Sequence, residues 1–217
     1  MEEAKQIIAT QTPLPSRHQD SHDILGTYKI VSNRKEMNIT PKSPKELMTI
    51  LKYRHKILLS ARTDKNPGLF KNKNNFAGQT AFVDLNLVEG TLIKGFEFYA
   101  ALIHPFAKAA YILFLISEIH PFLDGNGRIA RIMMNAELVH ANQTKIIIPN
   151  VFREDYILSL RRLTRQLDPD PYIRMLSRAH EFSSTIYGST IQATLEYSNA
   201  FLLPDEGMLR IISGDGV

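Results

Sequence analysis

The sequence predicts an all-α, mainly helical protein with one short β-hairpin beside its candidate functional site. Residues 107–118 and 129–139 are apolar on almost every side, which is typical of helices at the centre of a bundle. Residues 47–59 carry apolar side chains at helical spacing. Two buried neighbouring helices require others packed around them, so these patterns together predict a helical bundle.

The predicted elements follow one another along the chain. Residues 1–43 are rich in Pro, Ser, Gln, Asp and His, and we expect an extended arm with little regular structure there. Ser43-Pro44 fits an N-cap followed by proline at the first helical position, and this helix should end before the turn at Asn66-Pro67-Gly68. Apolar spacing predicts the remaining helices, at residues 91–102, 107–118, 129–139, 153–167, 171–187 and 190–202.

A β-hairpin is expected between the helix that begins at Pro44 and the helix at residues 91–102. Residues 74–78 offer turn residues, and residues 80–84 have the composition of a strand. The hairpin would consist of Phe76, Ala77, Gly78, Gln79, Thr80, Ala81, Phe82 and Val83.

The length of 217 residues predicts one domain with short appendages. We expect the domain at residues 44–203, with the arm at residues 1–43 and a C-terminal tail at residues 204–217. The absence of cysteine excludes a disulfide scaffold, a thiolate zinc site and cysteine nucleophiles. The first residues lack the pattern of a signal peptide, and no apolar run approaches the roughly 20 residues that span a bilayer. We therefore expect a soluble, cytoplasmic protein without membrane contact.

The charge balance permits an anionic partner without requiring one. Lys and Arg number 26 against 22 Asp and Glu, a net charge of +4. Seven cations lie between Lys52 and Lys73, with Asp64 as the single acid among them. A solvated helix face explains them better than a nucleic-acid surface does, because no aromatic RNA-binding pattern or helix-turn-helix pattern accompanies them. A non-catalytic module that binds nucleic acid or protein stays as an alternative.

Residues 120–131 read H-P-F-L-D-G-N-G-R-I-A-R and lead directly into a predicted helix. Gly125, Asn126 and Gly127 leave backbone N–H groups uncovered beside the positive end of that helix, which together form a nest for an anion such as phosphate. Arg128 and Arg131 are three residues apart on the first turns, so both guanidinium groups can reach successive phosphates. This arrangement favours a polyphosphate.

Two further side chains of the segment have chemistry that suits a polyphosphate. Asp124 lies at the mouth of the nest, where a carboxylate would repel phosphate unless Mg²⁺ lies between them. His120 has its unperturbed pKa near neutrality and is the candidate general base. Each residue alone also has an ordinary structural explanation, as a turn, a solvated arginine, a helix cap or a helix-end histidine. Their joint occurrence within twelve residues favours the functional one, whereas His104-Pro105-Phe106 lacks the glycines and arginines and is expected only to start a helix.

This segment resembles the signature of the Fic-domain family, H-P-F-x-[DE]-G-N-G-R-x-x-R, at every specified position. The resemblance implies a protein adenylyltransferase that transfers AMP from ATP to a Ser, Thr or Tyr hydroxyl of a protein and releases pyrophosphate. It implies that His120 is the base, that Asp124 holds Mg²⁺, and that the nest and both arginines bind the phosphates. The hairpin would be the flap that docks the target by strand addition. Self-modification is left open.

The resemblance also leaves several alternatives. Tyr156 is either part of the adenine pocket or a buried core tyrosine. A kinase of the Doc type or a phosphocholine transferase could use the same scaffold, although Doc-type motifs depart from Gly-Asn-Gly-Arg. Many Fic proteins carry an inhibitory [ST]-x-x-x-E-[GN] helix, and Glu36, Glu181 and Glu196 match it incompletely. All three are better explained as ordinary exposed glutamates on helices. The inhibitory segment is then absent, supplied by a partner chain, or lost with an upstream region if this chain is a fragment.

Overall fold

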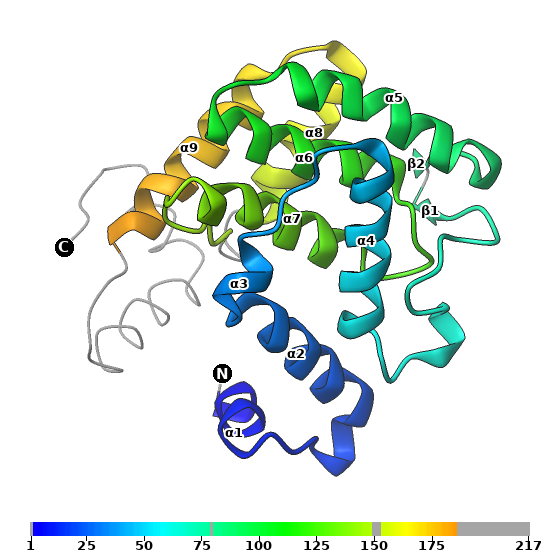
Figure 1. The fold of residues 1–217 in the computed structure, drawn as a ribbon, viewed down its shortest axis with the longest axis vertical. Coiled ribbons are helices and arrows are strands. Elements are labelled where there is room, and N and C mark those ends of the chain that lie inside the picture. The colour runs from blue at the N-terminus through cyan, green and yellow to red at the C-terminus, as the bar shows by residue number, and fades with distance from the viewer. Residues whose placement is uncertain (1, 79, 149–152, 186–217) are drawn as a thin grey trace. The chain divides into compact units, whose positions relative to one another are not determined.

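The computed structural model describes residues 2–78, 80–148 and 153–185 (Figure 1). The chain divides into two compact units, residues 1–142 and residues 143–217. In the first unit the helices are α1 (Glu2–Thr10), α2 (His18–Val31), α3 (Arg34–Met37), α4 (Pro44–Leu58), α5 (Val88–Ala101), α6 (Pro105–Ile119) and α7 (Asn126–His140), with short 3-10 helices at Pro15–Arg17, Thr63–Lys65 and Leu85–Leu87.

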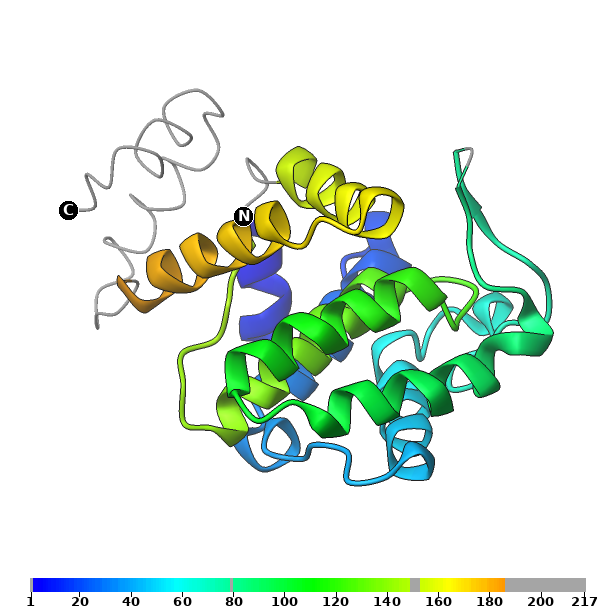
Figure 2. The same cartoon turned by 90° about the horizontal axis from the view of Figure 1, so that it is seen from above.

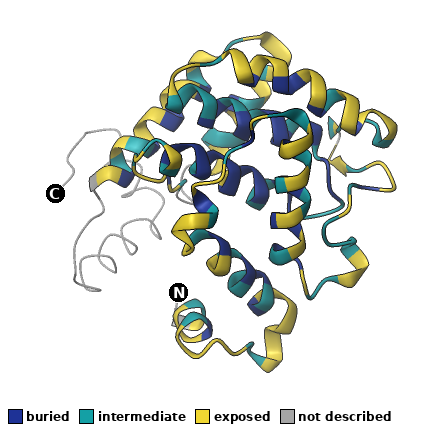
Figure 3. Ribbon diagram, in the orientation of Figure 1, coloured by how far each residue is buried: buried dark blue, intermediate teal, exposed yellow. Residues whose placement is uncertain are grey.

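Helices α6 and α7 are the central pair of the first unit and pack against each other along their length (Figure 1). Their facing side chains, including Leu113, Ile116, Ile129 and Met133, are fully buried. Helices α4 and α5 contact each other, and α5 packs on α6. Buried residues concentrate on the inner faces of these helices (Figure 3). The prediction of a mainly helical fold around two central helices is therefore confirmed.

The N-terminal 43 residues are not an extended arm, and that prediction is wrong. They form α1, α2 and α3, and α2 packs against α4. The polar composition of this segment predicted irregular structure because its helices bury only a few residues each, among them Ile7, Ile30 and Met37. Gly26 marks the position where α2 packs closely on α4, because a methyl group there would lie 2.6 Å from the carbonyl oxygen of Ile57. Glycine is needed because the backbones of α2 and α4 approach so closely.

Helix α4 begins where the sequence predicts. Ser43 is its N-cap, and its Oγ accepts a hydrogen bond from the backbone N–H of Glu46 at 3.2 Å. The Glu46 carboxylate in turn accepts from the backbone N–H of Lys42 at 2.9 Å. The helix ends at Leu58, before a turn in which Asn66 and Gly68 have left-handed backbones with φ of 51° and 84°.

The predicted hairpin is present as β1 (Phe76–Ala77) and β2 (Thr80–Ala81). The strands are antiparallel, with Phe76 opposite Ala81 and Ala77 opposite Thr80. Figure 2 shows the hairpin standing away from the helices of its unit. Gln79, at its tip, lies outside the described residues.

The second unit contains α8 (Arg153–Gln166) and α9 (Asp170–Thr185), which pack against each other. Both helices were predicted, and Tyr172, Leu176 and Ala179 of α9 are buried. The helix expected at residues 190–202 and the tail at residues 204–217 lie outside the described residues. Within the described ranges, no helix combines the length and the apolar character that crossing a bilayer requires.

Candidate active site

The segment singled out in the sequence connects α6 to α7. Helix α6 ends at Ile119, and His120 follows with a left-handed backbone (φ 49°, ψ 61°). Gly125, at φ 75°, is the N-cap of α7, and a methyl group on it would lie 3.1 Å from a Leu59 methyl carbon. A pocket of about 340 Å³ opens over this loop, lined by Asn75, Phe76, Ala77, Phe82, His120, Leu123, Asp124, Gly125, Asn126, Gly127, Arg128 and Arg131.

The loop is held in shape by the Asn126 side chain, which is 4% exposed. Its Oδ1 accepts from the backbone N–H of Phe122 at 2.9 Å, and its Nδ2 donates to the Phe122 carbonyl at 2.8 Å. The Phe122 ring is fully buried and anchors the loop. Asn126 therefore offers its backbone to the pocket, while its amide side chain closes the loop.

The tautomer of His120 follows from its hydrogen bond. Nδ1 lies 2.5 Å from the carbonyl oxygen of Ser117, and a carbonyl can only accept, so Nδ1 carries the proton. The lone pair of the neutral ring is then on Nε2. Burial lowers the pKa of His120 below its usual value, the bond to Ser117 opposes this effect, and the positive charge of Lys71 adds to it. Neutral His120 is thus the favoured form, as a general base requires.

The His120 ring is covered on one face by the hairpin. The Phe82 ring stacks on it with centroids 3.5 Å apart and planes within 10°. Phe76 and Ala77 of β1 line the same pocket. Gly78, Thr80, Ala81 and Val83 are not among the residues that line it. The hairpin therefore forms one wall of the pocket through part of its length.

The glycines and arginines of the segment meet at the start of α7. The first N–H groups of a helix have no partner within it, and Gly127 has no side chain to cover them. A methyl group on Gly127 would be 4.0 Å from Nη2 of Arg131, so this guanidinium lies beside the nest. Backbone N–H groups, a helix N-terminus and a guanidinium converge here, an arrangement suited to phosphate.

Asp124 is the acidic side chain among the residues that line the pocket, and it is 40% exposed. Its Oδ1 accepts from the backbone N–H of Gly125 at 2.6 Å. Among the described residues, no group of three His, Cys, Asp or Glu side chains could hold a metal ion. Magnesium at this position would depend on one carboxylate and on nucleotide phosphates, and the residues present fit that arrangement.

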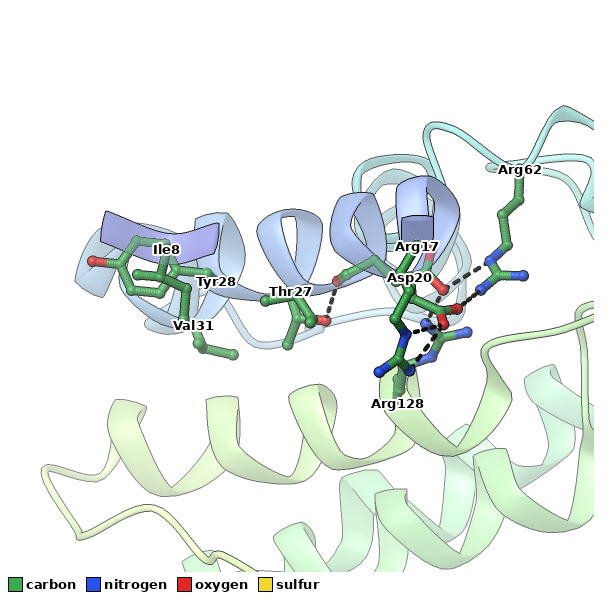
Figure 4. A pocket seen from close by; sticks show the side chains of 10 residues that line it. Ile8, Arg17, Asp20, Thr27, Tyr28, Val31, Arg62 and Arg128 are labelled. Carbon is green, nitrogen blue, oxygen red and sulfur yellow. Dashed lines mark hydrogen bonds and ion pairs between the residues drawn. The ribbon is translucent and has the colours of Figure 1, made fainter. Parts of the chain in front are cut away.

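Arg128 faces a second carboxylate, on α2. Its Nη1 donates to Asp23 Oδ2 at 2.6 Å, and Arg62 Nε donates to the same oxygen at 2.8 Å. Arg62 also pairs with Asp20 at 2.8 Å. Figure 4 shows Arg62 and Arg128 meeting at α2 beside a second pocket, of about 600 Å³. Arg128 lines both pockets, so its guanidinium is shared between the α2 carboxylate and the candidate phosphate site.

His55 is a site residue that the sequence analysis missed. It is fully buried, its Nδ1 accepts from the backbone N–H of Gly68 at 2.9 Å, and its ring stacks on Phe122 at 3.8 Å. Its Nε2 therefore carries the proton and donates to the Asp124 carbonyl at 3.1 Å. Burial lowers the pKa of His55 to about 4. The sequence offered one signal, a histidine on the apolar face of α4.

Three of the seven cations between Lys52 and Lys73 are held by internal contacts, whereas Lys56 and Lys73 are exposed. Arg54 is fully buried and binds Glu36 at 2.9 Å. Lys71 is 4% exposed, and Arg62 binds the α2 carboxylates. These contacts remove cations from the surface that a nucleic-acid site would need.

The three glutamates considered as inhibitory residues, and Tyr156, lie in different parts of the chain. Glu36 is bound to Arg54, so it is a structural residue and not an inhibitory one. Glu181 is exposed in α9, and Glu196 lies outside the described residues. Tyr156 lies in α8, in the second unit, and its role stays a prediction.

Residues 45–138 match the model of the Fic/DOC family. The protein adenylyltransferase Fic of Drosophila persimilis is 35% identical over 89 residues, which are 41% of this chain and 17% of that protein. Its Drosophila melanogaster counterpart is 34% identical over 89 residues, 41% of this chain and 18% of that protein. This chain thus matches less than a fifth of the length of these relatives.

Solved structures share the fold. Residues 134–508 of Fic-1 from C. elegans superpose with a TM-score of 0.68 at 19% identity, covering 84% of this chain and 55% of that one. A Fic family protein from Desulfovibrio desulfuricans gives a TM-score of 0.62 at 19% identity, covering 96% of this chain and 71% of that one.

Proposed function

Because this chain is a Fic-domain protein, we propose that it is a protein adenylyltransferase, which transfers AMP from ATP to a hydroxyl side chain of a protein. The observation that carries the proposal is the pocket itself. It joins a neutral His120, with its lone pair on Nε2, to a glycine nest flanked by Arg128 and Arg131. A base and a polyphosphate cradle in one pocket suit attack by a hydroxyl on a nucleotide phosphate.

The reaction follows from these groups. His120 Nε2 accepts the proton of the target hydroxyl as its oxygen bonds to the α-phosphorus. The bond between the α-phosphorus and the bridging oxygen to the β-phosphate breaks, and pyrophosphate leaves with that electron pair. The imidazolium keeps the proton until it is lost to solvent. The rate gain would come from positioning and from neutralising phosphate charge.

The other pocket residues have supporting roles in this proposal. The N–H groups at Asn126 and Gly127 and the guanidinium groups of Arg128 and Arg131 bind and orient the phosphates. Gly125, whose own N–H donates to Asp124 Oδ1, shapes the nest through its left-handed backbone. Asp124 would hold Mg²⁺, which would supply neutralisation of phosphate charge. The hairpin would dock the target main chain, and Tyr156 would contact adenine. Residues 44–203 remain the proposed domain.

The test uses ATP labelled at either the α- or the γ-phosphate, with Mg²⁺ and either a protein extract or the protein alone. Adenylylation predicts that α-label stays on protein, that γ-label leaves with pyrophosphate, and that His120→Ala abolishes labelling. Retention of γ-label would assign a kinase of the Doc type instead. An intact-mass measurement separates AMP from phosphate independently and also detects self-modification.

A further inference from the structure

We propose that Lys71 is a positioning residue that, with Asn75, fixes His120 in the orientation that points its Nε2 into the pocket. The proposal rests on the proposed role of His120 as the base. Residues 71–75 run from the turn after α4 to the start of β1, and none of them belongs to the motif at residues 120–131.

Lys71 holds the peptide groups on both sides of His120. Its backbone N–H donates to the Pro121 carbonyl at 2.8 Å. Its ammonium Nζ donates to the Ile119 carbonyl at 3.3 Å. One residue thus binds the carbonyl before His120 and the carbonyl after it, which restricts rotation of the chain at His120 itself.

Asn75 extends this grip by one residue. Its Oδ1 accepts from Lys71 Nζ at 2.8 Å, and its Nδ2 donates to the Phe122 carbonyl at 2.9 Å. Together the two residues hold the carbonyls of Ile119 and Phe122 through their side chains and the carbonyl of Pro121 through the Lys71 backbone N–H. The four hydrogen bonds form a clasp around the end of α6, which we call the Lys71–Asn75 clasp.

Burial of the Lys71 ammonium needs a reason, because a buried cation is costly unless it is paired. The residue is 4% exposed, and burial lowers the pKa of its ammonium, with Asp84 opposing that effect. Its position supplies the reason. The last carbonyls of α6 carry the negative end of the helix dipole, and α6 has no basic residue in its own last turn. Lys71 provides that missing cation from another part of the chain.

His120 needs such support because its backbone is left-handed, with φ of 49°. This conformation is unfavourable for residues with a side chain and persists where surrounding contacts over-determine it. Without the Lys71–Asn75 clasp, the chain after α6 could relax, the bond from Nδ1 to Ser117 would loosen, and Nε2 would leave the pocket.

The test compares Lys71→Met with the wild type. Met keeps most of the apolar stem and removes the ammonium. In the nucleotide-free protein, nitrogen-15 shifts of the His120 ring report which nitrogen carries the proton. We expect the wild type to show Nδ1 protonated and Nε2 bare, and the variant to show a mixture of tautomers. Single-turnover transfer should fall about 10- to 100-fold, as for a misplaced catalytic group, while ATP affinity changes less than about threefold.

Two further variants keep the test decisive. Lys73→Met makes the same change two residues along, at an exposed position, and should leave the His120 ring spectrum and the transfer rate unchanged. Asn75→Ala removes the bonds to Phe122 and Lys71, and its His120 ring spectrum and transfer rate should resemble those of Lys71→Met. If Lys71→Met does not fold, Asn75→Ala replaces it in the test. A wild-type His120 spectrum in both clasp variants would overturn the proposal. Because the spectra need no nucleotide, a wild type that transfers nothing would refute adenylylation and leave the positioning role to be judged by the spectra.

Discussion

Asp23 of α2 and Arg128 of α7 are joined by an ion pair in which Asp23 Oδ2 accepts from Arg128 Nη1 at 2.6 Å, across 105 residues of sequence. The Asp23 side chain is 8% exposed. Its other oxygen, Oδ1, is buried without a hydrogen bond in the part of the chain that the structure describes. An arginine at the phosphate nest is therefore partly neutralised by a carboxylate from the N-terminal helices.

We expect Asp23→Ala to tighten ATP binding, because the Arg128 guanidinium then has no competing carboxylate on α2. A gain of about fivefold corresponds to about 1 kcal/mol of competition removed. Calorimetry with ATP and Mg²⁺ measures the effect. Asp20→Ala is the matched control, because Asp20 binds Arg17 and Arg62 and has no bond to Arg128. Weaker binding in Asp23→Ala would mean that Asp23 orients Arg128 toward the phosphates.

Gly26→Ala should destabilise the first unit and detach α2 from α4. The added methyl group would lie 2.6 Å and 2.8 Å from the carbonyl oxygens of Ile57 and Leu58, and backbone atoms cannot move aside cheaply. We expect a loss of about 1–3 kcal/mol in the free energy of unfolding, as for overpacking in general. Gly90→Ala in α5 is the control, because nothing lies within 4 Å of a methyl group there. That change should stabilise the helix by about 0.5–1 kcal/mol. Urea unfolding of both variants compares them directly.

The stability of the first unit should fall as the pH drops from about 6.5 to about 4. His55 has its pKa lowered from 6.5 to about 4 by burial, so the unfolded chain binds a proton in this range before the folded protein does. Its contribution is therefore present above pH 6.5 and is lost as the pH falls through the folded value. The shift corresponds to about 3 kcal/mol. Urea unfolding at several pH values should give a shallower dependence for His55→Gln than for the wild type, and equal slopes would contradict the assignment.

Transfer should remain constant above neutral pH and decline only below about pH 6.5. The neutral form of His120 is the active base, and burial, aided by the Lys71 charge, places its pKa below the usual 6.5. The acid limb of kcat/KM reports the free enzyme, so it should lie on the acid side of that value. Nucleotide affinity measured over the same pH range separates titration of ATP from titration of His120. An acid limb above pH 7 would be incompatible with the buried ring.

Arg54→Leu should cost about 3 kcal/mol of stability. The guanidinium is fully buried, and it donates to the Glu36 carboxylate at 2.9 Å and to the carbonyls of Glu36 and Ile39 at 2.7 Å and 2.9 Å. Removing one partner of a buried ion pair leaves the other groups without partners. Arg17→Leu, which removes solvent-exposed ion pairs with Glu3 and Asp20, should change stability far less, because solvent screens exposed charges. Thermal unfolding of the two variants should separate them clearly.

Most of the predictions that the structure confirms came from patterns among neighbouring residues in the sequence. The N-cap at Ser43, the hairpin around Phe76 and the two apolar helices depend on neighbouring residues, and each was found where the sequence placed it. The N-terminal helices were missed because each buries only a few side chains, so their polar composition outweighed their periodicity. The close approach that explains Gly26 depends on α4, which no local pattern reveals.

By itself, the sequence determined the residues that could bind phosphate and act as a base, because glycine freedom, helix polarity and residue spacing act within twelve neighbouring positions. The tertiary structure decided which groups surround them. Asp23, His55 and Lys71 reach the loop from 105, 69 and 48 residues away along the chain. Such contacts depend on how helices pack, and they place a carboxylate, a buried imidazole and a buried ammonium against the motif residues.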